Sequence, residues 1–156
     1  MWQRIQTLFL AIAIAINLSL FFLNLGSTQV LEQTVYFTIY GFELPEALGS
    51  SHVILWLAFI CTLSMTLSFV SILSFKKRQT QIKLVQFNLL LQLAFVVALF
   101  FAVEKFMGEL STLGEATPPE YDLGAYLTLI PLLFIFLALK NIKKDEALVR
   151  AADRIR

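Results

Sequence analysis

The stretch KKRQTQIK, at positions 76–83, decides the fold because it places a short basic segment between two long apolar runs. The runs cover residues 53–75 and 84–103, and each is long enough to cross a bilayer, which takes about 20 mostly apolar residues. So short a segment between two such runs predicts a turn that divides the chain into two transmembrane hairpins. Because Lys and Arg concentrate on the cytoplasmic side of membrane proteins, we expect this loop to lie in the cytoplasm.

Two further apolar runs, at residues 5–25 and 123–139, complete a set of four, and none of the four has a charged residue or histidine in its interior. The chain is 58% hydrophobic and 15% charged, whereas soluble domains are about half apolar and roughly a quarter charged. The sequence therefore predicts a single membrane domain over residues 1–156. Its fold class is an all-α, antiparallel four-helix transmembrane bundle, followed by an amphipathic cytoplasmic tail helix at 140–156.

The first run also has features of a signal peptide, because A-x-A patterns at positions 11–15 follow the basic residue Arg4. Apolar sequence continues to Leu25, well beyond a cut at Ala13 or Ala15. We therefore favour a retained first span over a cleaved leader.

Charge predicts how the bundle is oriented. With both termini inside, 11 of the 12 Lys and Arg residues fall on the cytoplasmic side, and only Lys105 falls outside. Eight of the 11 acidic residues fall outside. The opposite orientation would reverse this bias, so we expect a multi-pass protein of the bacterial inner membrane with both termini cytoplasmic.

The first outer segment, residues 26–51, forms a cap over the bundle in this topology. Its part at 28–44 is rich in Val, Tyr, Phe, Ile and Thr, which favour strands. One interpretation is one or two short strands or a hairpin, and the other is an irregular aromatic loop. The second outer segment, 104–122, is acidic, and Pro118-Pro119 predicts an extended stretch there.

Polar side chains inside the spans are candidate intrabundle contacts, because an unsatisfied polar group costs several kcal/mol in lipid. Helical spacing places them in three groups, one on each of three spans: Asn17 and Asn24; Ser64, Ser68 and Ser71; Asn88 and Gln92. They fix the helix register by contacting one another, or line a polar ligand pocket, or form a subunit interface. In the fourth span, Pro131 predicts a kink, with Thr128 able to satisfy a freed carbonyl.

The tail carries the most distinctive charges. Together with Arg4, it offers a candidate docking surface on the cytoplasmic side, made of Arg4, Lys143, Lys144, Asp145, Glu146, Arg150, Asp153, Arg154 and Arg156. The opening MWQRIQT at 1–7 and the ending IKKDEALVRAADRIR at 142–156 resemble an uncharacterised family of small four-span inner-membrane proteins from Bacteroidetes. That family is a domain of unknown function, so the resemblance implies a fold and a location but no activity.

The sequence lacks the residues that several kinds of chemistry require. Ion-coupled transport usually needs an ionisable side chain inside the membrane, and the spans have none. Cys61 is the only cysteine and His52 the only histidine, so a disulfide, a cysteine-based site and a bis-histidine haem are excluded within one chain. No nucleotide-binding glycine loop is present. We expect no catalytic residue, metal or cofactor, and no nucleic-acid partner.

The leading hypothesis is a non-enzymatic accessory, scaffold or assembly subunit of an inner-membrane complex, which docks through its charged tail. Its partners would be the lipid bilayer and either another membrane protein or further copies of the chain. The alternative is a small lipid- or hydrophobe-binding or transport component with a polar-lined pocket inside the bundle. An enzyme that uses outer acidic residues or His52 is a third possibility.

Overall fold

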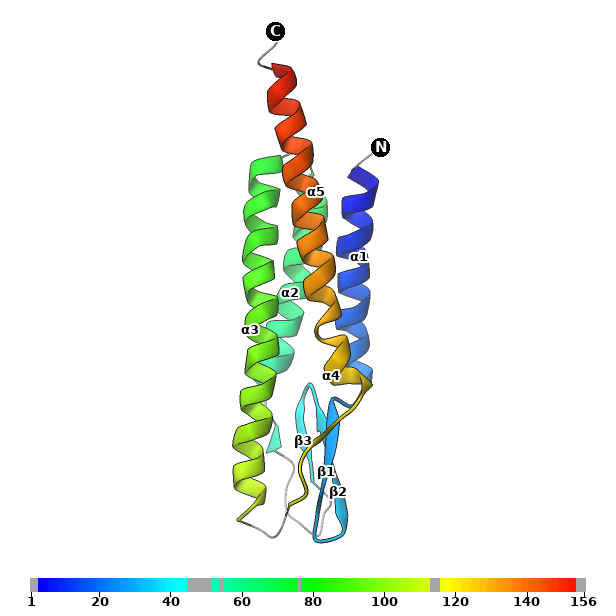
Figure 1. The fold of residues 1–156 in the computed structure, drawn as a ribbon, viewed down its shortest axis with the longest axis vertical. Helices are drawn as coiled ribbons and strands as arrows, with labels where there is room; N and C mark the ends of the chain where they lie inside the picture. Colours follow the sequence, from blue (N-terminus) through cyan, green and yellow to red (C-terminus); the bar gives the residue numbers. More distant parts are fainter. Residues whose placement is uncertain (1–2, 45–51, 54, 76, 113–115, 154–156) are drawn as a thin grey trace.

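The computed structural model describes residues 3–44, 52–53, 55–75, 77–112 and 116–153. A bundle of antiparallel helices runs along the long axis of the molecule, and a small sheet lies at one end (Figure 1). Among the described residues, four helices are long and apolar enough to cross a membrane. The helical elements are α1 Gln3–Ser19, the 3₁₀ helix η1 Leu20–Phe22, α2 Leu55–Leu73, α3 Arg78–Leu110, α4 Leu123–Leu127 and α5 Ile130–Asp153.

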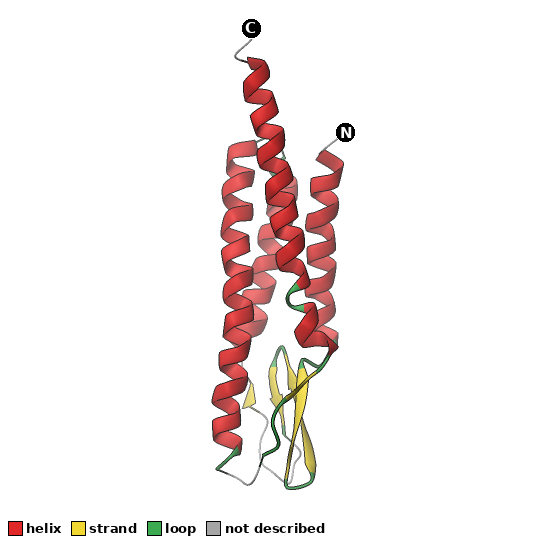
Figure 2. Ribbon diagram, in the orientation of Figure 1, coloured by secondary structure: helices red, strands yellow, loops and turns green. Residues whose placement is uncertain are grey.

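The bundle is a ring in which α1 packs on α2 and α5, and α3 packs on the same two helices. The start of α1 and the end of α5 lie at one end, which we call the termini end, and the sheet lies at the other, the sheet end (Figures 1 and 2). The expected four-helix arrangement is therefore confirmed.

The expectation of strands at 28–44 is confirmed, although the structure has three strands there and not one or two, and the irregular-loop interpretation is wrong. The sheet is antiparallel, with order β4-β3-β2-β1-β5, and its strands are β1 Gly26–Val30, β2 Gln33–Thr38, β3 Gly41–Glu43, β4 His52–Val53 and β5 Glu120–Tyr121. Strand β5 comes from the second outer segment, so the two outer segments form one sheet. His52 pairs with Phe42 through its backbone in β4.

The basic segment at 76–83 is helical over most of its length, which corrects the expected loop. Helix α3 already begins at Arg78, because no glycine or proline interrupts the segment. At its other end α3 continues to Leu110, seven residues past the expected end of the third span at 103. A helix of 33 residues is about 50 Å long, against about 30 Å for the apolar core of a bilayer.

The added turns of α3 cover the sheet. The ring of Phe106 stacks on Phe42, with the ring centres 3.7 Å apart, and meets Phe37 edge-on at 6.4 Å. All three side chains are buried. The apolar core at the sheet end is therefore shared between strands and helix, as in a soluble α+β layer.

The fourth span is broken, and the break lies where Pro131 predicts a kink. Helix α4 ends at Leu127 and α5 begins at Ile130, so that Pro131 occupies the first turn of α5, where its missing N–H has no intrahelical partner to lose. The hydroxyl of Thr128 donates to the carbonyl of Ala125 at 2.6 Å, which also accepts from the Thr128 N–H at 3.2 Å. This is not the carbonyl that Pro131 frees, because that carbonyl belongs to Leu127, four residues before the proline.

Gly124 in α4 is held against the chain that leaves the bundle towards β1. A Cβ at this position would overlap the backbone carbonyl of Asn24. By contrast, a Cβ at Gly108 in α3 would meet no neighbouring part of the described chain within 4 Å.

We expect Gly124→Ala to lower the free energy of unfolding by about 1–3 kcal/mol, because two backbone segments would have to separate. Gly108→Ala is the matched control, and it should raise that free energy by about 0.5–1 kcal/mol, because glycine is a poor helix former. Reversible unfolding in mixed detergent micelles measures both. A shift of the same sign in the two variants would contradict the packing assigned to Gly124.

Candidate functional site

A buried layer of polar side chains joins all four sides of the bundle. Asn17 of α1 and Gln92 of α3 exchange hydrogen bonds through their amides: Asn17 Nδ2 donates to Gln92 Oε1 at 3.2 Å, and Gln92 Nε2 donates to Asn17 Oδ1 at 3.4 Å. Gln92 Nε2 also lies 3.2 Å from the carbonyl oxygen of Thr128, at the break between α4 and α5. The broken helix therefore presents a backbone acceptor to the layer.

Helix α2 joins this layer through serines. The Ser64 hydroxyl lies 2.8 Å from Asn88 Oδ1 and 2.9 Å from Gln92 Oε1, so its single proton has two acceptors in reach. It also accepts from Asn17 Nδ2 at 3.5 Å. Asn88 Nδ2 donates to Ser68 Oγ at 2.7 Å. These five side chains are fully buried and are hydrogen-bonded to one another.

The polar layer lies between two apolar clusters. Along each of the three helices α1, α2 and α3, its residues separate a cluster towards the sheet end, which includes Leu20, Cys61 and Phe95, from buried positions towards the termini end. Sliding any one helix by a turn would remove partners from several amides at once. The contacts are those expected of the first of the three roles that the sequence left open, which is to fix the register of the helices.

Two of the predicted contacts are not made among the residues that the structure describes. Asn24 is exposed, because α1 ends at Ser19 and the chain passes through η1 into an extended link before reaching it. Ser71 is buried on the expected face of α2, but its hydroxyl has no hydrogen-bond partner among the described residues. The side chain of Gln81 contacts the backbone of Ser71 instead, because its Nε2 donates to the Ser71 carbonyl at 3.1 Å.

Two serines of α2 therefore give opposite predictions for one substitution. Ser64→Ala should lower the free energy of unfolding by about 1–2 kcal/mol, because it leaves Asn88 Oδ1 without a donor. Ser71→Ala should raise it by about 1 kcal/mol, because it removes a hydroxyl that is buried without a partner among the described residues. Unfolding curves of the two variants, recorded under the same conditions, test this difference in sign, and equal effects would refute it.

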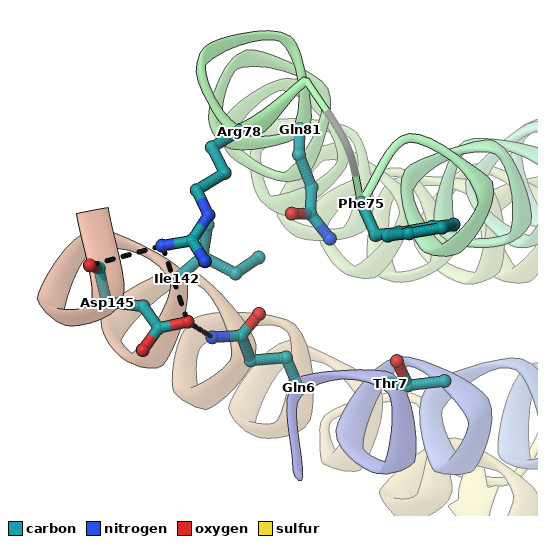
Figure 3. Close-up of a pocket in the computed structure, with 7 residues that line it drawn as sticks. All are labelled: Gln6, Thr7, Phe75, Arg78, Gln81, Ile142 and Asp145. Carbon is teal, nitrogen blue, oxygen red and sulfur yellow. Dashed lines mark hydrogen bonds and ion pairs between the residues drawn. The ribbon is translucent and has the colours of Figure 1, made fainter. Parts of the chain in front are cut away.

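At the termini end, three helices meet around Asp145 of α5. Arg78 of α3 donates from Nη1 to the Asp145 carbonyl oxygen at 3.2 Å and lies 3.6 Å from its carboxylate. Gln6 of α1 donates from Nε2 to Asp145 Oδ2 at 3.4 Å. Figure 3 shows Arg78 and Gln6 reaching Asp145 from separate helices. Ile142 lies one turn earlier on α5 and is buried, so Asp145 faces the bundle.

This junction ties the tail helix to the bundle. The junction residues line a small pocket, to which Thr7, Phe75 and Gln81 also contribute. The pocket has room for about one water molecule. The ion pair is partly exposed, at 29% and 18%, so it contributes at most about 1 kcal/mol.

The predicted docking surface is thereby divided. Asp145 is used inside the molecule and is not presented to a partner, whereas Lys143 and Lys144 are exposed and Glu146 is half-buried. The other predicted members lie outside the described part of the chain: Arg154 and Arg156 entirely, and Arg4, Arg150 and Asp153 in their side chains.

The sequence reasoning missed Gln6 and Gln81, although a signal for both was present. Gln6 precedes Asn17 by 11 residues, which is three helical turns, and Gln81 precedes Asn88 by seven, which is two. Each therefore lies on the same buried face as the amide that was identified.

Comparisons with known proteins give a family without an activity. Residues 2–155 match the family described as Domain of unknown function (DUF4293). A comparison with curated proteins found no match. The expected resemblance to an uncharacterised family is confirmed, and because the match covers nearly the whole chain, the protein belongs to the DUF4293 family.

Proposed function

We propose that the protein is a multi-pass protein of the bacterial inner membrane with its termini end in the cytoplasm. Large apolar side chains are exposed on all four long helices, among them Leu8, Phe59, Leu90 and Leu133, which suits contact with lipid. Apart from Lys105, the described basic residues gather at the termini end, and the described acidic residues of the two outer segments lie at the sheet end. This distribution suits a cytoplasmic termini end under the charge rule for membrane proteins.

Single cysteines test this orientation. In a Cys61→Ala background, Gln29→Cys places an exposed thiol on β1, and Ala147→Cys places one on α5. A membrane-impermeant maleimide should label the first in spheroplasts and the second only after permeabilisation. The reverse labelling would overturn the proposed orientation.

Within that membrane, the protein serves as a non-enzymatic accessory or scaffold subunit that docks a partner protein through the end of α5. One observation supports this proposal most directly. Helix α5 extends beyond the ends of α1 and α3 (Figure 1), and there Leu148 and Val149 are 59% and 44% exposed. From Ile142 to Asp153 the helix rises about 16 Å.

The part of α5 from Ile142 to Asp153, which we call the arm, carries charged residues and this exposed apolar pair. Such a surface suits a protein partner. The junction at Asp145 holds the base of the arm, so that its free end does not need to become ordered when it binds, and binding costs less conformational entropy. A straight continuation of α5 also carries Leu148 away from the apolar part of a bilayer. The partner would therefore be a cytoplasmic segment of another membrane subunit or a protein bound to one.

Photo-crosslinking in cells tests the docking. A photoreactive residue at Leu148 should give a discrete crosslinked protein, whereas the same residue at Leu133, which is 62% exposed on the same helix, should not give that product. The double substitution Leu148→Glu and Val149→Glu should abolish co-purification of the crosslinked protein without changing the abundance of the chain, because both side chains are exposed. No crosslinked protein from position 148, or unchanged co-purification of the double variant, would refute the proposal.

A further inference from the structure

A second surface feature lies beside the arm, in a shallow groove between α3 and α5 at the termini end. It is lined by Ile82 of α3 and by Lys143, Glu146 and Ala147 of α5. The groove has a volume of about 310 Å³ and is an open depression of the surface, not an enclosed cavity. It is separate from the junction at Asp145 and from the exposed pair at Leu148 and Val149.

The face of α5 that borders the groove changes from apolar to basic along its length. Phe136, Lys140, Lys143 and Ala147 follow one another at helical spacings of four, three and four residues, so they share this face. Phe136 is 52% exposed, and both lysines are exposed. On the proposed insertion, with Lys140 at the edge of the apolar core, Lys143 lies about 5 Å farther out, in the head-group region.

Lysines outnumber acids near the groove. Its lining contains one base, Lys143, and one acid, Glu146. Two more exposed lysines are close in the chain, because Lys83 follows Ile82 on α3 and Lys140 precedes Lys143 by about one turn of α5. An apolar surface at membrane depth that ends in lysines at the head-group level is complementary to one kind of molecule, with an acyl chain below and a negative phosphate above.

We propose that this groove binds an anionic phospholipid, with its head group in the groove at Lys143 and an acyl chain that leaves the groove along the same face of α5, past Lys140 to Phe136. The site rests on the proposed insertion in a membrane, but it does not depend on the docking of a partner protein. Bound lipid would fill the gap between α3 and α5 next to the base of the arm.

Native mass spectrometry of the purified full chain tests the site, with phosphatidylglycerol and phosphatidylcholine as the probes. We expect retention of phosphatidylglycerol in preference to phosphatidylcholine. Lys143→Gln should weaken phosphatidylglycerol binding about five-fold, the effect of one basic residue close to an anionic lipid. The matched control is Lys105→Gln, which removes the same charge from the sheet end of α3 and should leave this binding unchanged.

Two further measurements distinguish lipid binding in the groove from general attraction between charges. Ala147→Phe keeps every charge and fills the groove, so it should also weaken phosphatidylglycerol binding. Soluble glycerol phosphate should not displace the lipid, because it lacks the acyl chain. Equal retention of the two lipids, equal losses in Lys143→Gln and Lys105→Gln, no effect of Ala147→Phe, or displacement by glycerol phosphate would each overturn the proposal. Because no partner is present, these outcomes are independent of the crosslinking result.

Discussion

Replacing Gln92 with leucine is expected to lower the free energy of unfolding by about 2–4 kcal/mol. The side chain contacts Asn17, Ser64 and the carbonyl of Thr128. Its loss leaves Asn17 Oδ1 and the Thr128 carbonyl without a donor among the described residues, whereas Ser64 keeps Asn88 Oδ1 as its acceptor. Each buried group left unsatisfied costs about 1–3 kcal/mol. Leucine is similar in size to glutamine, so the effect measures lost hydrogen bonding and not a cavity.

Unfolding in mixed detergent micelles gives the comparison, and Gln86→Leu is its control. Gln86 lies on the same helix but is exposed, so this substitution should change the free energy of unfolding by less than about 0.5 kcal/mol. A double variant, Asn17→Leu with Gln92→Leu, should lose less stability than the sum of the two single variants, because both members of the amide pair are removed together. Equal stability of the Gln86 and Gln92 variants, or strict additivity of the pair, would show that the amides do not hold the bundle together.

Phe106→Ala is expected to cost about 3–5 kcal/mol, with the loss concentrated at the sheet end. The ring is buried between Phe42 and Phe37, so truncation leaves a cavity where α3 meets the sheet. Hydrogen exchange should show faster opening of β2 and β3, and added protease should cleave there sooner.

The control for this variant is Phe101→Ala on the same helix. Phe101 is 65% exposed, so its truncation removes a ring of the same size without opening a cavity in the core. In Phe101→Ala, the backbone amide hydrogens of the sheet should exchange at the same rate as in the unchanged protein. Similar exchange in the two variants would mean that α3 does not support the sheet.

Much of the polar layer could be predicted from the sequence, because helical periodicity alone places side chains on faces. Asn17, Ser64, Ser68, Asn88 and Gln92 were identified in this way, and the structure brings all five together. The prediction was wrong where a helix ended earlier than its apolar run. Asn24 belongs to such a run, but the chain has already left α1 there.

Ser71 shows a second limit of periodicity. It lies on the correct face of α2, yet which residue faces it depends on the register between α2 and α3. At that level α3 presents Gln81, which bonds to the backbone of Ser71 and not to its hydroxyl. The spacing of residues within one helix does not show which residue of the neighbouring helix lies beside each of them.

The basic segment at 76–83 remains the point about which the chain folds back, although only its first residues lie outside α3. The sequence by itself determined four apolar helices, their antiparallel order and the separation of charge between the two ends, because these depend on local composition and on the short connection between α2 and α3. It also determined the position of the break before Pro131, because proline acts on its own helix.

Only the tertiary structure decided which long-range partners meet. The strand β5 pairs with β1 across more than 90 residues, Arg78 and Gln6 converge on Asp145, and the carbonyl of Thr128 completes the polar layer. Each of these contacts joins segments that are distant in the chain. Their geometry follows from how the helices pack side by side, and that packing is set by the shapes of all the buried side chains together.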